Sequence, residues 1–180
     1  MSTGLQTITL GGGCFWCTEA VFVGVKGVED VESGYCNGHV VRPDYQQVCS
    51  GGSGHNEVVK LQFDPRQISL REILEIFFLV HDPTTLNRQG HDMGTQYRSG
   101  IYFSTPEQQL VANELIAEMS GEGVYASPIV TEVAPLANYW AAEDYHQDYF
   151  AKNPYQGYCM AVAAPKVAKF RKTYARLARN

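Results

Sequence analysis

The residues most able to do chemistry stand in the stretch GGGCFWC, residues 11–17. It places two thiols, Cys14 and Cys17, three positions apart and separates them by the large aromatic pair Phe15 and Trp16. Thiols in this setting could ligate a metal, form a redox-active disulfide, or attack a substrate as a nucleophile. Each possibility requires different partners elsewhere in the chain.

A zinc site is the first alternative, because Cys14 and Cys17, followed by Cys36 and His39, approximate a four-ligand spacing. Such a site normally lies on a turn of small and polar residues, whereas two aromatic residues occupy this one. His39 stands in a segment rich in turn residues, where a histidine is usually solvated. We keep a zinc-stabilised binding module as an alternative and expect no metal. No compact ligand spacing links the other histidines, which we interpret as surface or structural residues: His55, His81, His91 and His146.

A dithiol oxidoreductase is the second alternative, since Cys14 and Cys17 at the start of a helix can form a disulfide. The helix dipole would then lower the pKa of Cys14. The two residues between such thiols are usually small or proline, so Phe15 and Trp16 fit this role poorly. A dinucleotide-binding loop is excluded, because its third glycine would fall at Trp16.

A nucleophilic cysteine is favoured by an acid on a nearby strand. Residues 57–63 alternate, which puts Glu57 on the same face as Val59, Leu61 and Phe63. Desolvation on this apolar face would raise the pKa of Glu57 and keep it protonated near neutral pH, as a general acid requires. A position at the solvent edge of the face is the alternative.

Two tyrosines, Tyr45 and Tyr97, stand in polar loops rather than in apolar runs. Phenol hydroxyls in such loops can polarise a substrate oxygen, although most loop tyrosines only cover core surface.

Periodicity and capping signals predict the elements that position these residues. The predicted strands are 5–10, 57–63, 100–103 and 129–133, and the predicted helices are 15–23, 70–81, 105–119, 139–150 and 166–177. Segments 31–56, 82–97 and 153–159 are predicted loops, and loops this long inside a compact domain are usually functional. The pattern indicates an α/β or α+β fold around one mixed sheet.

Composition narrows the class of protein. With 180 residues, 44% hydrophobic and 18% charged, the chain is typical of one globular domain. A net charge of −5 argues against nucleic acid as the main partner. The N-terminus lacks a signal peptide pattern, no apolar run is long enough to span a membrane, and the five cysteines are an odd number. We therefore expect a cytoplasmic protein that binds no membrane and whose thiols are not a static disulfide framework.

Several ordered blocks together resemble one family, peptide methionine sulfoxide reductase A. The resemblance spans about residues 5–165, nearly the whole chain. Its blocks are residues 13–16 with Glu19, 45–51, 54–59, 81–84, 88–99, 143–147 and 153–159.

The resemblance implies reduction of the S epimer of methionine sulfoxide in oxidised proteins, in peptides or as the free amino acid. Cys14 would attack the sulfoxide sulfur and become a sulfenic acid. Glu57 would protonate the oxygen, Tyr45 and Tyr97 would hold it by hydrogen bonds, and Asp92 would organise the site.

The same resemblance implies how the substrate is held and how the enzyme is regenerated. Phe15 and Trp16 would wall a pocket for the terminal methyl group. Cys159 would resolve the sulfenic acid by forming a disulfide. Cys17 is the alternative, because a cysteine stands here, three residues from Cys14, where this family usually has glycine. Thioredoxin would be the external reductant, and no bound cofactor is expected.

The family fold is a single α+β domain with a mixed sheet of the ferredoxin-like type, flanked by helices and long functional loops. Residues 1–180 would form one catalytic domain, with 166–180 as a basic C-terminal tail that could be helical.

Overall fold

The computed structural model describes residues 4–180, so the predicted domain of residues 1–180 begins with three residues outside the described part. The main sheet has six strands: β1 (Gln6–Gly11), β2 (Val28–Cys36), β3 (Asn56–Phe63), β6 (Gly100–Phe103), β7 (Glu132–Pro135) and β8 (Trp140–Ala141). Their order is β7-β6-β1-β3-β2-β8, and only β6 and β7 pair in parallel. The predicted α+β class and mixed sheet are confirmed.

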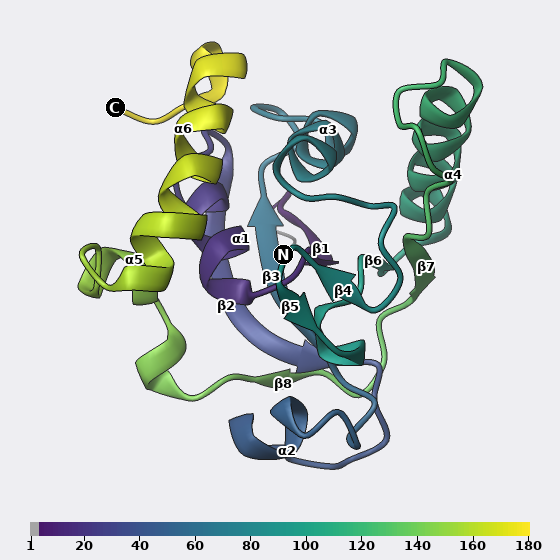
Figure 1. Cartoon of the computed structure of the whole chain (residues 1–180). Helices are drawn as coiled ribbons and strands as arrows, with labels where there is room; N and C mark the ends of the chain where they lie inside the picture. Colours follow the sequence, from purple (N-terminus) through teal and green to yellow (C-terminus); the bar gives the residue numbers. More distant parts are fainter. Residues whose placement is uncertain (1–3) are drawn as a thin grey trace.

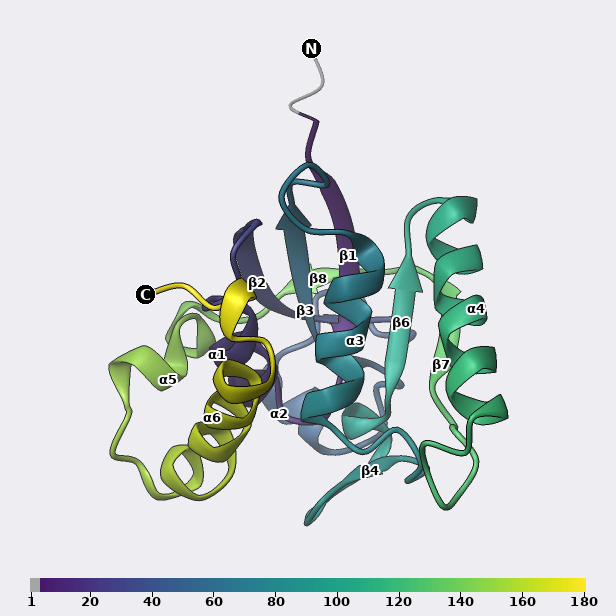
Figure 2. The same cartoon turned by 90° about the horizontal axis from the view of Figure 1, so that it is seen from above.

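Four longer helices flank this sheet: α1 (Phe15–Phe22), α3 (Leu70–Val80), α4 (Pro106–Gly121) and α6 (Ala164–Thr173). Figures 1 and 2 show α1, α3 and α6 gathered on one face, with α4 beside β6 and β7. Two short helices, α2 (Tyr45–Cys49) and α5 (Tyr149–Lys152), and a small hairpin, β4 (Arg88–Gln89) with β5 (Asp92–Met93), complete the elements around them. No helix within residues 4–180 has the length and apolar character that crossing a bilayer requires.

The main core lies between the sheet and these helices. The alternation predicted for β3 is confirmed, because Val59, Leu61 and Phe63 are fully buried in this core. The opposite face of β3 contributes Val58 to a smaller cluster with Cys36, covered by the segment around Tyr139. Glu57 therefore points toward the main core and the start of α1.

The helix start signals in the sequence are confirmed at α3 and α4. Ser69 and Glu72 form the predicted reciprocal capping box at α3. At α4, Pro106 occupies the first turn and Thr105 accepts the hydrogen bond of the Gln108 N–H. These side chains satisfy backbone donors that the first helical turn leaves unpaired.

Replacing the α3 cap tests this local contribution. In Ser69→Ala the Glu72 N–H loses its side-chain acceptor at 3.1 Å, so we expect the free energy of unfolding to fall by about 1 kcal/mol. Urea denaturation measures it. Ser104→Ala, at an exposed position before the α4 cap, is the control and should change stability by less than about 0.5 kcal/mol. Equal stability of the two variants would contradict a stabilising role of Ser69 as the N-cap of α3.

The predicted loop over residues 31–56 is wrong in its first part. Residues 31–36 complete β2, which pairs with β3 on one side and β8 on the other. The strand sequence VEDVESGYC contains charged residues and a glycine, so its pattern does not predict a strand. The register of its pairing with β3 shifts between Val28 and Asp30. Pairing inside the sheet outweighs the weak local preference of these residues for strand. The predicted loop 82–97 likewise contains the β4–β5 hairpin.

The predicted helix over residues 139–150 is also wrong. That segment contains β8, a 3₁₀ turn at Asp144–His146 and only the start of α5. The strand predicted at 129–133 is displaced to β7. Cys159 does not end a loop but begins a π-helical turn, Cys159–Ala163, which continues into α6. The basic tail is helical, and it packs Phe170 and Leu177 into the core rather than lying wholly in solvent.

Candidate active site

A glycine-rich turn leads from β1 to Cys14, which is the N-cap residue of α1. Gly13 has a φ of +92°, and a Cβ there would lie 2.6 Å from the Gln89 side chain. Only glycine satisfies both the positive φ and this close approach. The predicted strand, turn and helix start are therefore confirmed, and they hold Cys14 in a nearly buried position with 9% of its surface exposed.

Glu57 lies directly behind this turn. Its Oε1 accepts a hydrogen bond from the backbone N–H of Phe15 at 3.2 Å, and its buried Oε2 has no hydrogen-bond partner. Burial, aided by the negative charges of Asp92 and Cys17, raises the pKa of Glu57 to about 8 despite the Phe15 bond. Glu57 is thus a buried carboxylic acid at neutral pH rather than a residue at the solvent edge.

Three thiols share one cluster, in which Cys14, Cys17 and Cys159 are all buried. Burial raises the pKa of Cys14 well above its ordinary value, and hydrogen bonding to Cys17 raises it further. The expectation that the helix start lowers the pKa of Cys14 is therefore wrong, because desolvation outweighs the Trp16 N–H that favours the thiolate. The hydrogen bond with Cys14 lowers the pKa of Cys17 instead.

The predicted oxygen-binding tyrosines come from two separate segments, and the charge of Glu57 acts on both. Tyr45 is the first residue of α2 and Tyr97 ends a 3₁₀ turn, Thr95–Tyr97. Burial and the charge of Glu57 both raise the pKa of each phenol, so both hydroxyls remain protonated donors. Cys49 lies close to both and also contributes to these shifts.

Asp92 is the first residue of β5. Its carboxylate accepts a short hydrogen bond from the Tyr158 hydroxyl, and that hydroxyl lies 3.8 Å from the Cys17 sulfur. Asp92 is therefore connected to the thiol cluster through Tyr158. Sequence reasoning missed Tyr158, although it directly precedes the predicted resolving thiol Cys159.

An aromatic wall stands over the start of α1. The Trp16 ring stacks on Tyr149 with centroids 3.8 Å apart, and its Nε1–H donates to His146 Nδ1 at 2.9 Å. The Phe15 ring contacts His146 at 4.9 Å between centroids. The predicted methyl-pocket residues follow Cys14 directly in the chain, with Phe15 fully buried and Trp16 partly exposed.

Sequence reasoning also missed His146 and Glu143, which lie in a segment predicted to be helical. Glu143 accepts hydrogen bonds from the Tyr35 hydroxyl at 2.8 Å and the Tyr45 N–H at 3.0 Å, which fixes the start of α2. Burial lowers the pKa of His146, so its ring is neutral and accepts the Trp16 hydrogen bond. Single-sequence periodicity carries no signal for a contact across 130 residues.

The four residues of the zinc alternative do not come together. Cys14 and Cys17 belong to the thiol cluster, whereas Cys36 packs with Val58 and Tyr102 in the separate cluster on the opposite face of the sheet. His39 is exposed. This separation removes the geometric basis of the predicted zinc module.

Comparisons with known proteins agree with this arrangement. The family model described as peptide methionine sulfoxide reductase matches residues 6–178. Peptide methionine sulfoxide reductase MsrA of Trichodesmium erythraeum is 55% identical over 170 residues, which cover 94% of this chain and 96% of the relative.

Two solved structures extend the comparison. Mxr1 of Saccharomyces cerevisiae in reduced form is similar with a TM-score of 0.81 and 35% identity, covering 88% of this chain and 91% of that one. Mxr1 in complex with Trx2 is similar with a TM-score of 0.58 and 25% identity, covering 83% of this chain and 87% of that one.

Proposed function

Because this chain belongs to the peptide methionine sulfoxide reductase A family, we propose that it reduces methionine S-sulfoxide with Cys14 as nucleophile and Glu57 as general acid. Oxidised proteins, peptides and free methionine S-sulfoxide are the substrates. The observation that carries the proposal is the contact between Glu57 and the backbone N–H of Phe15, which places a buried acid beside the residue that follows Cys14. The whole chain, residues 1–180, acts as one catalytic domain.

The chemical step transfers one oxygen atom between two sulfur atoms. The Cys14 thiolate attacks the sulfoxide sulfur while Glu57 donates its proton to the sulfoxide oxygen. The attack forms a bond between the two sulfur atoms. This S–S bond and the S–O bond of the substrate then break as the oxygen moves to Cys14, which becomes a sulfenic acid, and the methionine thioether is released. The methionine sulfur gains two electrons and the Cys14 sulfur loses two, so no further oxidant or reductant takes part in this step.

Tyr45 and Tyr97 donate hydrogen bonds to the sulfoxide oxygen, a role that their protonated, half-buried hydroxyls support. Asp92 organises the site by holding the Tyr158 hydroxyl. Donors already aimed at the oxygen stabilise the charge that develops there without reorganising during the reaction.

Phe15 and Trp16 bind the terminal methyl group. Stacking on Tyr149 and the hydrogen bond to His146 hold the indole in one orientation. Burial of one methyl group contributes only about 1–3 kcal/mol of discrimination. Selection of the S epimer therefore depends on fixing the methyl group and the oxygen at the same time.

Two thiols, Cys17 and Cys159, act one after the other to restore the reduced Cys14. Sequence reasoning placed Cys159 first, but the contacts favour Cys17, which is hydrogen-bonded to Cys14 and has a lowered pKa. The Cys17 thiolate attacks the Cys14 sulfenic acid, releasing water and forming a disulfide. Cys159, whose neighbour is Cys17, then attacks Cys17, so that the disulfide moves to Cys17 and Cys159 and frees Cys14.

Thioredoxin supplies the two electrons that reopen the last disulfide. Support comes from the similarity to Mxr1, a protein with a structure in complex with Trx2. The reaction as proposed uses only protein thiols and one acid, so it requires no metal or organic cofactor. The cytoplasm, where thiols are kept reduced, is the compartment that suits five free cysteines.

The order of the two resolving thiols is tested with Cys159→Ser and Cys17→Ser. After one equivalent of methionine S-sulfoxide, Cys159→Ser should release one methionine and stop as a Cys14–Cys17 disulfide. Cys17→Ser should instead retain a Cys14 sulfenic acid or form a Cys14–Cys159 disulfide. Mass spectrometry of linked peptides distinguishes these products.

The control for this experiment is Cys36→Ala, since Cys36 packs on the opposite face of the sheet. It should cycle with thioredoxin like the unmodified protein. A Cys14 sulfenic acid that persists in Cys159→Ser would contradict the order and leave Cys159 as the direct resolving thiol.

A further inference from the structure

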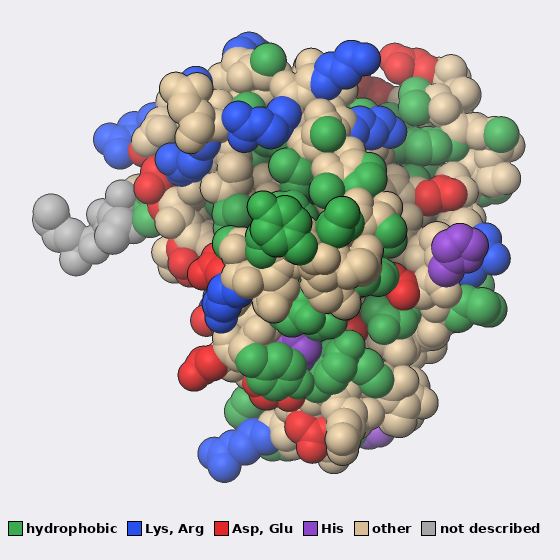
Figure 3. All heavy atoms as spheres, turned by 60° about the vertical axis from the view of Figure 1, so that its left-hand side comes forward, with side chains coloured by type: hydrophobic (Ala, Val, Ile, Leu, Met, Phe, Trp, Pro, Cys, Tyr) green, Lys and Arg blue, Asp and Glu red, His purple; other side chains and the backbone are tan. Residues whose placement is uncertain are grey.

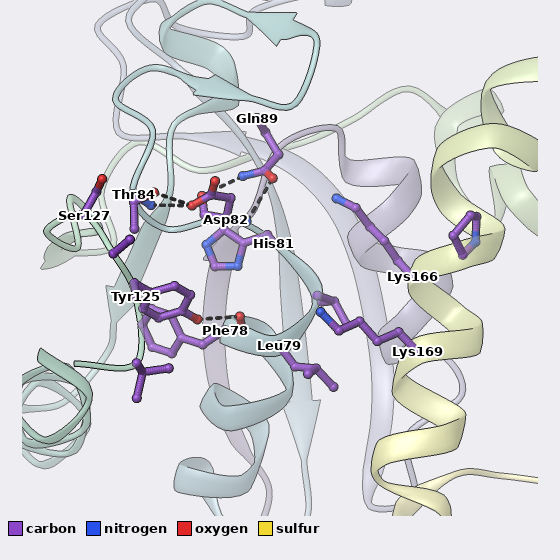
Figure 4. A pocket seen from close by; sticks show the side chains of 14 residues that line it. Phe78, Leu79, His81, Asp82, Thr84, Gln89, Tyr125, Ser127, Lys166 and Lys169 are labelled. Atoms are coloured by element: carbon purple, nitrogen blue, oxygen red, sulfur yellow. Dashed lines mark hydrogen bonds between the residues drawn. The ribbon is translucent and has the colours of Figure 1, made fainter. Parts of the chain in front are cut away.

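A groove of about 750 Å³ lies beside the active site (Figure 4). Its walls are the end of α3, the segment 82–89, the segment 124–127 and the start of α6. A volume of this size accommodates several side chains of a bound molecule. None of the predicted site residues lines it, so the proposed chemistry leaves it unexplained.

The floor of the groove is apolar and fixed. Phe78 and Leu79 come from α3, and Val124 and Tyr125 face them from the segment that follows α4. The Tyr125 hydroxyl donates to the Phe78 carbonyl at 2.9 Å, which holds the two walls together. Val124 is 54% exposed, so apolar surface here is open to a partner.

One wall carries unpaired positive charge. Lys166 and Lys169 extend from successive turns of α6 toward the groove, and none of the ion pairs found within residues 4–180 includes either lysine. Figure 3, with the α6 side forward, shows Lys and Arg side chains gathered on the upper part of this face. In a chain with a net charge of −5, this wall is a local exception.

The opposite wall carries one negative charge, but none of the ion pairs found within residues 4–180 joins it to either lysine. Asp82 is its acidic residue, and its carboxylate accepts hydrogen bonds from the backbone N–H of Thr84 at 2.9 Å and its hydroxyl at 2.6 Å. Burial lowers the pKa of His81 to about 4, so its ring is neutral. Its Nδ1 is hydrogen-bonded to the Phe77 carbonyl and its Nε2 to the Ser99 hydroxyl. The groove therefore offers an apolar floor with two free ammonium groups along one side.

One side chain that lines the groove, Gln89, also packs against Gly13 in the turn before Cys14. Gln89 exchanges two hydrogen bonds of 2.9 Å with the Asp82 backbone, and its Cβ and Cγ pack where a side chain of residue 13 would stand. Lys166 lies near the thiols as well, since hydrogen bonding to Cys14 and the charge of Lys166 both lower the pKa of Cys17. A polypeptide with its oxidised methionine at Cys14 would have neighbouring residues at this groove.

We propose that this groove binds the part of an oxidised protein that flanks its methionine sulfoxide, and that it favours flanks in which Asp or Glu stands among apolar residues. The inference rests on the proposed function and adds a substrate preference to it. Apolar flanking side chains pack on Leu79, Val124 and Tyr125, which are all at least partly exposed. The flanking carboxylate pairs with Lys169 and Lys166. Such exposed ion pairs contribute modestly and weaken as salt increases.

The test compares two peptides that carry methionine S-sulfoxide and identical apolar flanks, one with two glutamates and one with two lysines in the flanks. Single-turnover rates without reductant separate substrate binding from regeneration. The unmodified protein should prefer the glutamate peptide, and the preference should shrink in high salt. Lys169→Glu should lower the ratio of the two second-order rate constants by about threefold to tenfold.

Lys172→Glu is the matched control, because Lys172 is an exposed lysine of α6 outside the groove. It introduces the same charge change on the same helix and should keep the original ratio. Equal rates for the two peptides, or equal ratios in the two variants, would overturn the proposal. So would an effect of Lys169→Glu confined to thioredoxin-driven cycling, because the groove would then serve the reductant.

N-acetyl methionine S-sulfoxide, which has no flanking residues, separates this proposal from the proposed function. If this small substrate is reduced while peptide preference is absent, only the groove proposal fails. If neither the small substrate nor either peptide is reduced, the proposed reaction itself fails.

Discussion

Cys14→Ser should lower the rate of methionine sulfoxide reduction by at least about 1,000-fold. A serine hydroxyl does not ionise at accessible pH and cannot take up oxygen as a sulfenic acid, so both the attack and the product are lost. The residue is the N-cap of α1, and serine is a favoured residue at that position, so the fold should be retained. The measurement is release of methionine in a single turnover, with circular dichroism as the check on folding.

The matched control is Cys36→Ala, which removes another buried thiol from a cluster that does not contact the site. It should keep a single-turnover rate within a few-fold of the unmodified protein. Turnover that survives in a folded Cys14→Ser protein would exclude Cys14 as the nucleophile.

Glu57→Gln should lower the single-turnover rate by about 10²- to 10⁴-fold, the usual contribution of a general acid. Glutamine keeps an oxygen that can accept the Phe15 N–H, but it has no proton to give to the sulfoxide oxygen. The reduction in rate should therefore come from the chemistry rather than from a displaced turn.

The pH dependence follows from the pKa values of the two reacting groups. Burial raises the pKa of Glu57 to about 8, and burial raises that of Cys14 well above its ordinary value. Below pH 8 both groups therefore carry a proton in the free protein. The reacting pair needs one proton in total, on Glu57, with Cys14 as the thiolate. Hence kcat/KM should rise with pH up to about 8, level off, and fall again above the pKa of Cys14, where the pair has lost both protons.

In Glu57→Gln the ionisation near pH 8 should disappear from this profile. The remaining rate should follow ionisation of the Cys14 thiol, which occurs at higher pH. A variant that keeps the rate and the pH profile of the unmodified protein would remove Glu57 as the acid.

The elements that sequence reasoning predicts correctly are those with strong local signals. The Ser69 and Thr105 caps mark α3 and α4, and the alternation from Glu57 to Phe63 marks β3. The failures are β2 and β8, which form because neighbouring strands pair with them. The residues of β2, VEDVESGYC, carry several charged side chains and a glycine, so they resemble a loop until β3 lies beside them.

The site shows the same division. Cys14 and Glu57, the proposed reacting pair, each stand in a local pattern that the sequence shows, a glycine turn before a helix and an acid on an apolar strand face. His146 and Tyr158 were missed because their roles arise from contacts with residues more than 60 positions away, Trp16 and Asp92. The direction of the Cys14 pKa shift was also missed, because it depends on burial that no local pattern reveals.

The most direct test of the account is mass spectrometry of the protein that lacks both resolving thiols, Cys17→Ser with Cys159→Ser. It is treated with one equivalent of methionine S-sulfoxide and then with a reagent that labels sulfenic acids. The account predicts one released methionine per protein and one label, on the peptide that contains Cys14. Methionine released while Cys14 remains an unmodified thiol would contradict the claim that this sulfur accepts the oxygen.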